Sequence, residues 1–165
     1  MQLIIDKSCL SACAEIILPS AKEIRFLNDP IIGFHWNPHM NRYLLDTYAV
    51  EDLDKCAWKN IPKIEEIYNR KNLKLDFWKH SLNQLNLEAY QVDYKQGQCP
   101  WHSKKFKNHM WLPTSKQLRE LWGLKFKGSI CADNFEECKK KIDHRWKEGL
   151  HIVVGDEVYT SKGRK

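Results

Sequence analysis

Residues 109–123 place the tightest constraint on how this chain folds, because they carry signals for both ends of one helix. Pro113 disfavours a helical conformation at the residue before it, so the chain is expected to enter this segment in an extended form. Thr114 is a suitable N-cap, and the side chain of Gln117 can reach back to the Thr114 amide in a capping box. Gly123 can take the left-handed conformation that closes a helix. The segment therefore predicts a helix between Thr114 and Gly123.

Apolar side chains recur along one face of that predicted helix. Leu118, Leu121 and Trp122 have the spacing of a single helical face. A stripe with this spacing usually packs inward. We therefore expect these three residues, together with Trp111 just before the helix, to form core or interface packing rather than a substrate site.

The same segment resembles a motif of small, uncharacterised proteins encoded by bacteriophages. The similarity rests on Trp111-Leu112-Pro113, then Gln117-Leu118, then Glu120-Leu121, and it covers residues 111–121 only. The resemblance implies a phage or mobile-element origin, with the host-cell cytoplasm as the location. It transfers no active-site residue.

The chain has 165 residues, and 42% of them are hydrophobic, so we expect one packed domain. Sub-lobes at residues 1–98 and 99–165 are an alternative division. Short predicted helices alternate with short predicted strands, which indicates an α+β fold. We predict a mainly antiparallel sheet with several short helices and a C-terminal hairpin.

The first part of the chain gives several local predictions. The apolar run Leu3-Ile4-Ile5 precedes a predicted helix over Ser8–Leu18, which Pro19 ends. Asn28-Asp29-Pro30 predicts a turn. A second helix is expected from Pro62 to about Asn69. Strands are expected over residues 31–36, 73–77 and 89–94. A short helix or loop is expected over 81–87 and a loop over 96–100. The apolar residues within 40–59 fit the helical period and the strand period equally.

The C-terminal third carries clearer signals. Residues 126–130 predict a strand, and Asp133 predicts a helix N-cap with Glu136 at the capping-box position. His151–Val154 and Glu157–Thr160 flank a two-residue Gly-Asp turn and predict a hairpin. The apolar stripe expected on the helix before that hairpin is Phe135, Cys138, Ile142 and Trp146.

The six cysteines are interpreted through the expected location of the chain. No stretch approaches the ~18 apolar residues of a membrane span. Charged residues interrupt the apolar N-terminus at Asp6, Lys7 and Glu15, so a signal peptide is not expected. We therefore expect a cytoplasmic protein whose cysteines are free thiols or metal ligands rather than disulfides.

Charge and aromatic content favour binding to a macromolecule. The formal net charge is +6, and the chain holds seven tryptophans. Lysines alternate with rings around residues 101–109, where they can grip phosphates and stack on bases, or dock on an acidic protein. The alternative interpretation is a solvated loop. The predicted partner-binding residues are Trp101, Lys104, Lys105, Phe106 and Lys107.

A metal-dependent nuclease is the first alternative. Asp93 and Lys95 form an acid-x-lysine triplet after a predicted strand, and Glu88 or Asp46 could supply a second acid. Carboxylates would hold the metal while the lysine stabilises charge on the phosphorus centre. Similar triplets occur elsewhere in this lysine-rich chain, so the pattern is not specific.

A structural zinc site is the second alternative. Cys99, His102 and His109 combine a thiolate with two imidazoles, which are ligand types that suit zinc. The fourth ligand would come from Cys131 and Cys138, or from His35 and His39. The alternative interpretation is that these are ordinary loop and surface histidines that bind no metal.

Other catalytic signatures are absent from the sequence. It has no Gly-x-Ser-x-Gly motif, phosphate-binding glycine loop, dinucleotide fingerprint or deaminase motif. The leading hypothesis is therefore a basic, non-enzymatic accessory protein that binds a host or defence protein, or nucleic acid, and needs no cofactor.

Overall fold

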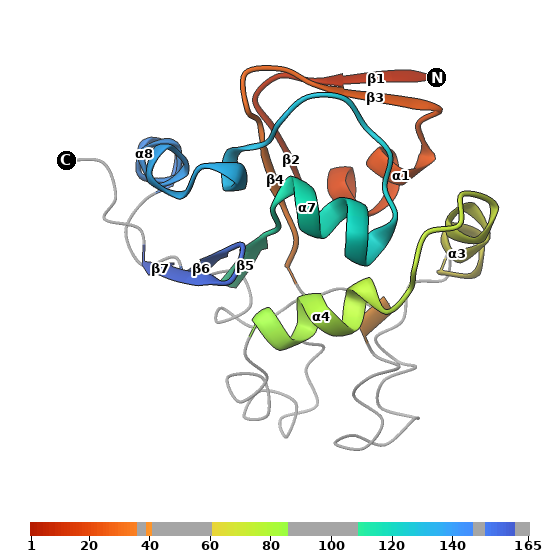
Figure 1. The fold of residues 1–165 in the computed structure, drawn as a ribbon. Coiled ribbons are helices and arrows are strands. Elements are labelled where there is room, and N and C mark those ends of the chain that lie inside the picture. Colours follow the sequence, from red (N-terminus) through yellow and green to blue (C-terminus); the bar gives the residue numbers. More distant parts are fainter. Residues whose placement is uncertain (36–38, 41–60, 86–108, 147–150, 161–165) are drawn as a thin grey trace.

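The computed structural model describes residues 1–35, 39–40, 61–85, 109–146 and 151–160. Helices and strands are interleaved along the chain, which confirms the α+β class (Figure 1). The strands are β1 (Gln2–Ile5), β2 (Ser8–Leu10), β3 (Glu23–Phe26), β4 (Ile31–Gly33), β5 (His109–Leu112), β6 (His151–Val154) and β7 (Glu157–Thr160). The helices are η1 (Cys13–Ile17), α1 (Leu18–Ser20), α3 (Ile61–Arg70), α4 (Phe77–Gln84), α7 (Ser115–Gln117), η4 (Leu118–Trp122), η5 (Cys131–Asp133) and α8 (Phe135–Arg145).

Strand pairing is more parallel than the sequence predicted. β1 pairs with β3, β2 with β4 and β5 with β6, all in parallel, and the β6–β7 hairpin is antiparallel. Among the described strands, the predicted antiparallel arrangement thus matches the hairpin and an isolated antiparallel bridge between Phe34 and Trp111. Turn residues specify a hairpin locally, whereas partners for the other strands come from distant segments that local patterns do not identify.

The segment around Thr114 forms as predicted. The Thr114 hydroxyl accepts a hydrogen bond from the Gln117 backbone amide at 3.2 Å. The side-chain carbonyl oxygen of Gln117 accepts one from the Thr114 backbone amide at 2.9 Å. The helix continues as α7 and η4, and Gly123 closes it with φ of 85°. The capping box and the left-handed glycine are therefore confirmed.

The core is built around a cluster of rings. Phe34 lies with its ring centre 5.2 Å from Phe77 and 5.7 Å from Trp122, and both contacts are edge-on. Phe77 and Trp122 stack with ring centres 4.6 Å apart. Trp111 joins the cluster, and its indole N–H donates to the Gly155 carbonyl at 2.9 Å. The core prediction is confirmed for Trp111, Leu118 and Trp122, which are fully buried, and Leu121 is half-buried against them.

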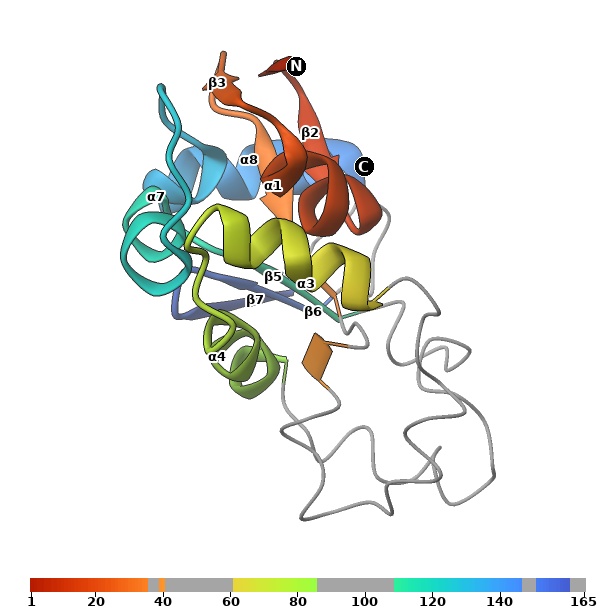
Figure 2. The same ribbon diagram turned by 90° about the vertical axis from the view of Figure 1, so that its right-hand side faces the viewer.

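The described elements are arranged from one end of the fold to the other. Figures 1 and 2 both show β1 and β3 at one end and α4 toward the other, with β4, β5 and α7 between them. Among the described helices, none is long and apolar enough to cross a membrane.

The predicted helix over Ser8–Leu18 is wrong in its first part. Residues Ser8–Leu10 form a strand because their backbone pairs with Ile31–Gly33, and this distant pairing overrides the helical pattern. Helical structure starts only at Cys13, and Pro19 lies inside α1 rather than ending the helix. The predicted turn before β4 is present, since Asn28 and Asp29 have positive φ angles.

Three further predictions have mixed outcomes. Helix α3 confirms the helix expected from Pro62 to Asn69. The predicted strand at 73–77 is wrong, because Lys74 donates its amide to the Trp122 carbonyl at 2.8 Å and α4 then begins at Phe77. The predicted strand at 126–130 is also wrong and is reduced to a single bridge between Lys127 and Arg25. The expected strand at 89–94 and the loop at 96–100 lie outside the described residues.

Of the predictions for the C-terminal third, the hairpin is confirmed and the helix cap is shifted by one residue. The hairpin is confirmed residue for residue, with Val154 opposite Glu157. The cap of α8 is Asn134, whose side chain accepts from the Glu137 amide at 3.2 Å, so the prediction of Asp133 with Glu136 is one residue early. Asp133 does not cap this helix because its carboxylate binds other groups, which are described below.

Candidate functional site

The predicted partner-binding residues lie outside the described part of the chain. This applies to Trp101, Lys104, Lys105, Phe106 and Lys107. It applies equally to the nuclease candidates Glu88, Asp93 and Lys95, and to the zinc candidates Cys99 and His102. These assignments remain predictions.

His109 is the zinc candidate that the structure describes. It is half-buried on β5 and pairs with His151 on β6, with ring centres 4.8 Å apart. Burial and the neighbouring charge of His109 lower the pKa of His151. The other proposed ligands lie with different partners: His35 contacts Ser11, and His39 lies 3.4 Å from a Glu65 carboxylate oxygen. In the described residues, no group of three metal-ligating side chains comes together.

The prediction of free thiols is wrong for the four described cysteines. Cys9 is joined to Cys13, and Cys131 to Cys138, by disulfide bonds. The first bond joins β2 to the start of η1 over a sequence separation of 4, and the second joins η5 to α8 over a separation of 7. Cys131 and Cys138 are therefore not available as thiolate ligands in this state. Free thiols were expected because a cytoplasmic location was expected. Disulfides are more typical of oxidising compartments, so the disulfides do not support that location, which stays a prediction.

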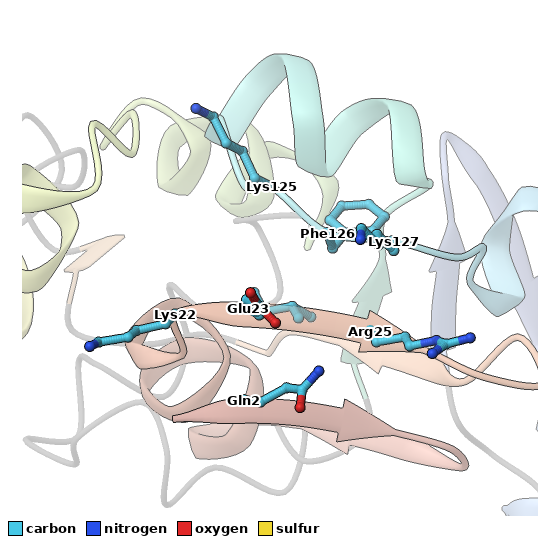
Figure 3. Close-up of a pocket in the computed structure, with 8 residues that line it drawn as sticks. Gln2, Lys22, Glu23, Arg25, Lys125, Phe126 and Lys127 are labelled. Atoms are coloured by element: carbon cyan, nitrogen blue, oxygen red, sulfur yellow. The ribbon is translucent and has the colours of Figure 1, made fainter.

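The described surface contains an open pocket with a basic lining, which we call the basic pocket. Its volume is about 310 Å³. Figure 3 shows side chains from β1 and β3 on one side and from the segment after η4 on the other. The lining residues are Gln2, Lys22, Glu23, Ile24, Arg25, Lys125, Phe126 and Lys127.

Backbone pairing along β3 positions the two sides of this pocket. β3 alternates, so Glu23 and Arg25 are exposed while Ile24 and Phe26 are buried. The Lys127 amide donates to the Ile24 carbonyl at 3.0 Å, and the Phe26 amide donates to the Lys127 carbonyl at 2.9 Å. These bonds hold residues 125–127 against the edge of β3, so the exposed lysines lie beside the exposed Arg25.

A glycine makes this close approach sterically feasible. Gly128 has φ of 95°, and a Cβ atom there would lie 2.3 Å from the Phe26 carbonyl oxygen. Phe126 covers the inner side of the pocket, with its ring centre 4.8 Å from Phe26 and 4.2 Å from the Arg119 guanidinium carbon. The pocket therefore has a firm aromatic base beneath a charged rim.

The charges of the basic pocket are arranged to attract an anion. Four cationic side chains against the single carboxylate of Glu23 leave three positive charges around one opening. Within the described residues, none of the four cations forms an ion pair. The lysines of α8 differ, because Lys139 pairs with Glu136 at 2.7 Å and Lys140 with Glu137 at 2.6 Å. The unpaired cations of the pocket are thus the stronger candidate for binding an external anion.

A second polar group, around Tyr68, is enclosed by the core. The Tyr68 hydroxyl donates to the Glu15 carbonyl at 2.5 Å, and His39 stacks on Trp78 with ring centres 5.4 Å apart. Burial, followed by the charges of Glu15 and Glu65, raises the pKa of Tyr68 far above its usual value. Tyr68 therefore stays neutral and acts as a structural hydrogen-bond donor.

Sequence reasoning missed the residues of the basic pocket. Lys125-Phe126-Lys127 repeats the basic-aromatic order of Lys105-Phe106-Lys107, so the signal was present. The partner cations Lys22 and Arg25 lie about a hundred residues earlier, and their proximity follows only from the fold.

The pocket and its charges define a basic surface on a small α+β fold. Comparison of the chain with protein-family models, with curated proteins and with solved structures found no match.

Proposed function

We propose that this protein works by binding an anionic macromolecule, and that the partner is nucleic acid. The observation that carries the proposal is the basic pocket, in which Lys22, Arg25, Lys125 and Lys127 surround one opening without intramolecular ion pairs among the described residues. Phosphates attract such a group of cations strongly, because binding releases the counterions condensed on the nucleic acid.

The pocket supplies charge rather than sequence recognition. Lysine and arginine side chains on an open surface contact phosphate groups and carry no direct base readout. The predicted basic loop, with Trp101 and Phe106, would add stacking on unpaired bases. We therefore expect single-stranded nucleic acid to bind with little sequence preference and with strong dependence on salt.

The test compares charge reversal in the pocket with the same charge change elsewhere. A labelled single-stranded oligonucleotide is titrated by fluorescence anisotropy between ~50 mM and ~200 mM salt. Lys125→Glu combined with Lys127→Glu should weaken binding by about tenfold or more at low salt and reduce the salt dependence. The control combines Lys63→Glu on α3 with Lys79→Glu on α4, two exposed lysines away from the pocket.

Two outcomes would contradict the proposal. One is equal binding by the pocket variant and the control variant, which would mean that only net charge matters. The other is binding to an acidic polypeptide, such as polyglutamate, with no binding to the oligonucleotide, which would identify an acidic protein as the partner class.

The predicted loop residues are tested in the same assay. Reversal of Lys104, Lys105 and Lys107 to glutamate should weaken binding further if the loop contributes phosphate contacts. Unchanged affinity would remove this loop from the binding site while leaving the basic pocket in place.

A further inference from the structure

Ser11 and His35 form a hydrogen-bonded pair away from the basic pocket. The His35 Nε2 atom lies 2.5 Å from the Ser11 hydroxyl oxygen. Ser11 directly follows β2, and His35 is the second residue after β4. Because β2 and β4 are parallel and in register from Ser8 opposite Ile31, both side chains lie at the carboxyl edge of this strand pair. Ligand sites of parallel strands usually lie at that edge.

The backbone of Ser11 has an uncommon conformation. Its φ is 55°, which places a non-glycine residue in the sparsely populated left-handed region. Its amide donates to the Gly33 carbonyl at 3.1 Å, and its carbonyl accepts from the Glu15 amide at 2.9 Å. A positive φ and a position between a strand and a helical segment are features that Ser11 shares with the serine of a nucleophile elbow.

The residues around Ser11 explain why a motif search misses this geometry. In a nucleophile elbow, the positions two before and two after the serine are close together and are usually glycine. Here they are Cys9 and Cys13, which are joined by a disulfide with their Cα atoms 5.2 Å apart. The bond brackets Ser11 and holds the tight turn that paired glycines would otherwise permit.

The histidine is held as firmly as the serine. Phe34, the residue before His35, exchanges two backbone hydrogen bonds of 2.8 Å with Trp111, and its own ring is fully buried in the aromatic cluster. Ser11 and His35 are themselves half-buried, and Ala12 between Ser11 and Cys13 is exposed. The pair is therefore preorganised yet retains accessible surface.

We propose that Ser11 is a nucleophile and His35 its general base in a hydrolase that acts on carboxylic esters. The Ser11 oxygen attacks the carbonyl carbon while His35 Nε2 takes the hydroxyl proton. The leaving alcohol departs with that proton and an acyl-serine ester remains. Water then attacks the ester with His35 again as base, which releases the carboxylic acid and restores the serine. In this proposal the amide of Ala12, the residue after the nucleophile, stabilises the oxyanion.

A fluorophosphonate probe tests the nucleophile directly. The serine oxygen displaces fluoride and forms a bond to phosphorus, so the modified peptide is found by mass spectrometry. We expect the label on Ser11, and we expect hydrolysis of p-nitrophenyl acetate with a burst of nitrophenol as the acyl-enzyme forms. His35→Gln should slow labelling by about 100-fold or more, the usual contribution of a general base. Ser8→Ala, on the same strand, is the matched control and should label at the wild-type rate.

Ser11→Gly separates chemistry from folding, because glycine accepts the positive φ of this position. The variant should lose labelling and ester hydrolysis while its thermal midpoint stays equal to or above that of the wild type. The proposal is overturned if the wild type takes up no label at Ser11, or if Ser11→Gly or His35→Gln is labelled at the wild-type rate.

Discussion

The carboxylate of Asp133 binds Ser115 through both of its oxygens. One oxygen accepts from the Ser115 amide at 2.7 Å, and the other accepts from the Ser115 hydroxyl at 2.5 Å. The second oxygen also accepts from the Ile130 amide at 2.9 Å. This one side chain therefore joins the start of α7 to the η5 turn, and a charged acceptor near a helix N-terminus is also favoured by the helix dipole.

Removal of that carboxylate should destabilise the fold substantially. Asp133→Ala leaves three donors without their acceptor, and Ser115 is only 7% exposed. Hydrogen bonds to charged groups contribute about 1.5–3 kcal/mol each, so a loss of about 3 kcal/mol in the free energy of unfolding is expected. Urea denaturation measures it, with the exposed Glu120→Ala as control. A change of less than about 0.5 kcal/mol, typical of surface positions, would contradict this role.

Gly33 is expected to accept a side chain only if the neighbouring side chains move. A Cβ atom there would lie 2.7 Å from Leu112 Cδ2 and from Met110 Sδ, and 2.8 Å from Leu10 Cδ2. Gly33→Ala should therefore cost about 1–3 kcal/mol through overpacking. The double variant with Leu10→Ala provides the control, because truncation of Leu10 makes room. The two substitutions should cost less together than the sum of their separate effects, and simple additivity would contradict the steric explanation.

His151 should make stability depend on pH. Its pKa in the folded state is lowered, first by burial and then by the charge of His109, so the unfolded chain binds the proton more readily. Stability therefore rises with pH across the window that ends at the ordinary histidine pKa of about 6.5, and it falls as pH drops through that window. Urea denaturation of wild type and His151→Gln at several pH values between about 5 and 8 measures the difference. His109→Gln should weaken the dependence, and an unchanged pH profile in His151→Gln would exclude this origin.

The nuclease alternative makes a prediction opposite to that of the binding proposal. If nucleic acid is bound and not cut, wild type and Asp93→Ala should leave single- and double-stranded substrates equally intact with Mg²⁺ or Mn²⁺. Electrophoresis of labelled substrates provides the measurement. Metal-dependent cleavage that Asp93→Ala and Lys95→Ala both abolish would instead establish the nuclease.

Metal analysis addresses the zinc alternative. Since Cys131 and Cys138 are bonded to each other, the cluster around Cys99 and His102 would lack their thiolates. We expect the purified, non-reduced protein to carry clearly less than one zinc per chain, as measured by plasma mass spectrometry. Zinc bound at one per chain and lost in Cys99→Ser would establish the site instead.

Local signals in the sequence predicted the parts of the fold that depend on neighbouring residues. The capping box at Thr114, the start of α3 near Pro62 and the hairpin turn at Gly155 are all determined within a few positions. The strand Ser8–Leu10 was missed because its partner begins at Ile31, and pairing over that distance outweighs a local helical pattern.

The same limit applies to the candidate sites. The lysine pattern at Lys125 and Lys127 was visible, but the contribution of Arg25 depends on a backbone bridge that no spacing reveals. The contact between Ser11 and His35 likewise requires two parallel strands to end at one edge. The predicted partner-binding residues of the basic loop and the acid-x-lysine triplet of Asp93 and Lys95 lie outside the described residues. Their roles are tested by the experiments described above.

The stacked rings at the centre of the fold also give the protein an optical signature. Trp122 lies with its ring centre 4.6 Å from Phe77 and 5.6 Å from Trp78, so their electronic transitions are coupled in one fixed asymmetric arrangement. Circular dichroism in the near ultraviolet should therefore report side-chain packing, while the far ultraviolet reports the backbone. A variant that keeps the second signal and loses the first has a loosened core rather than an unfolded chain.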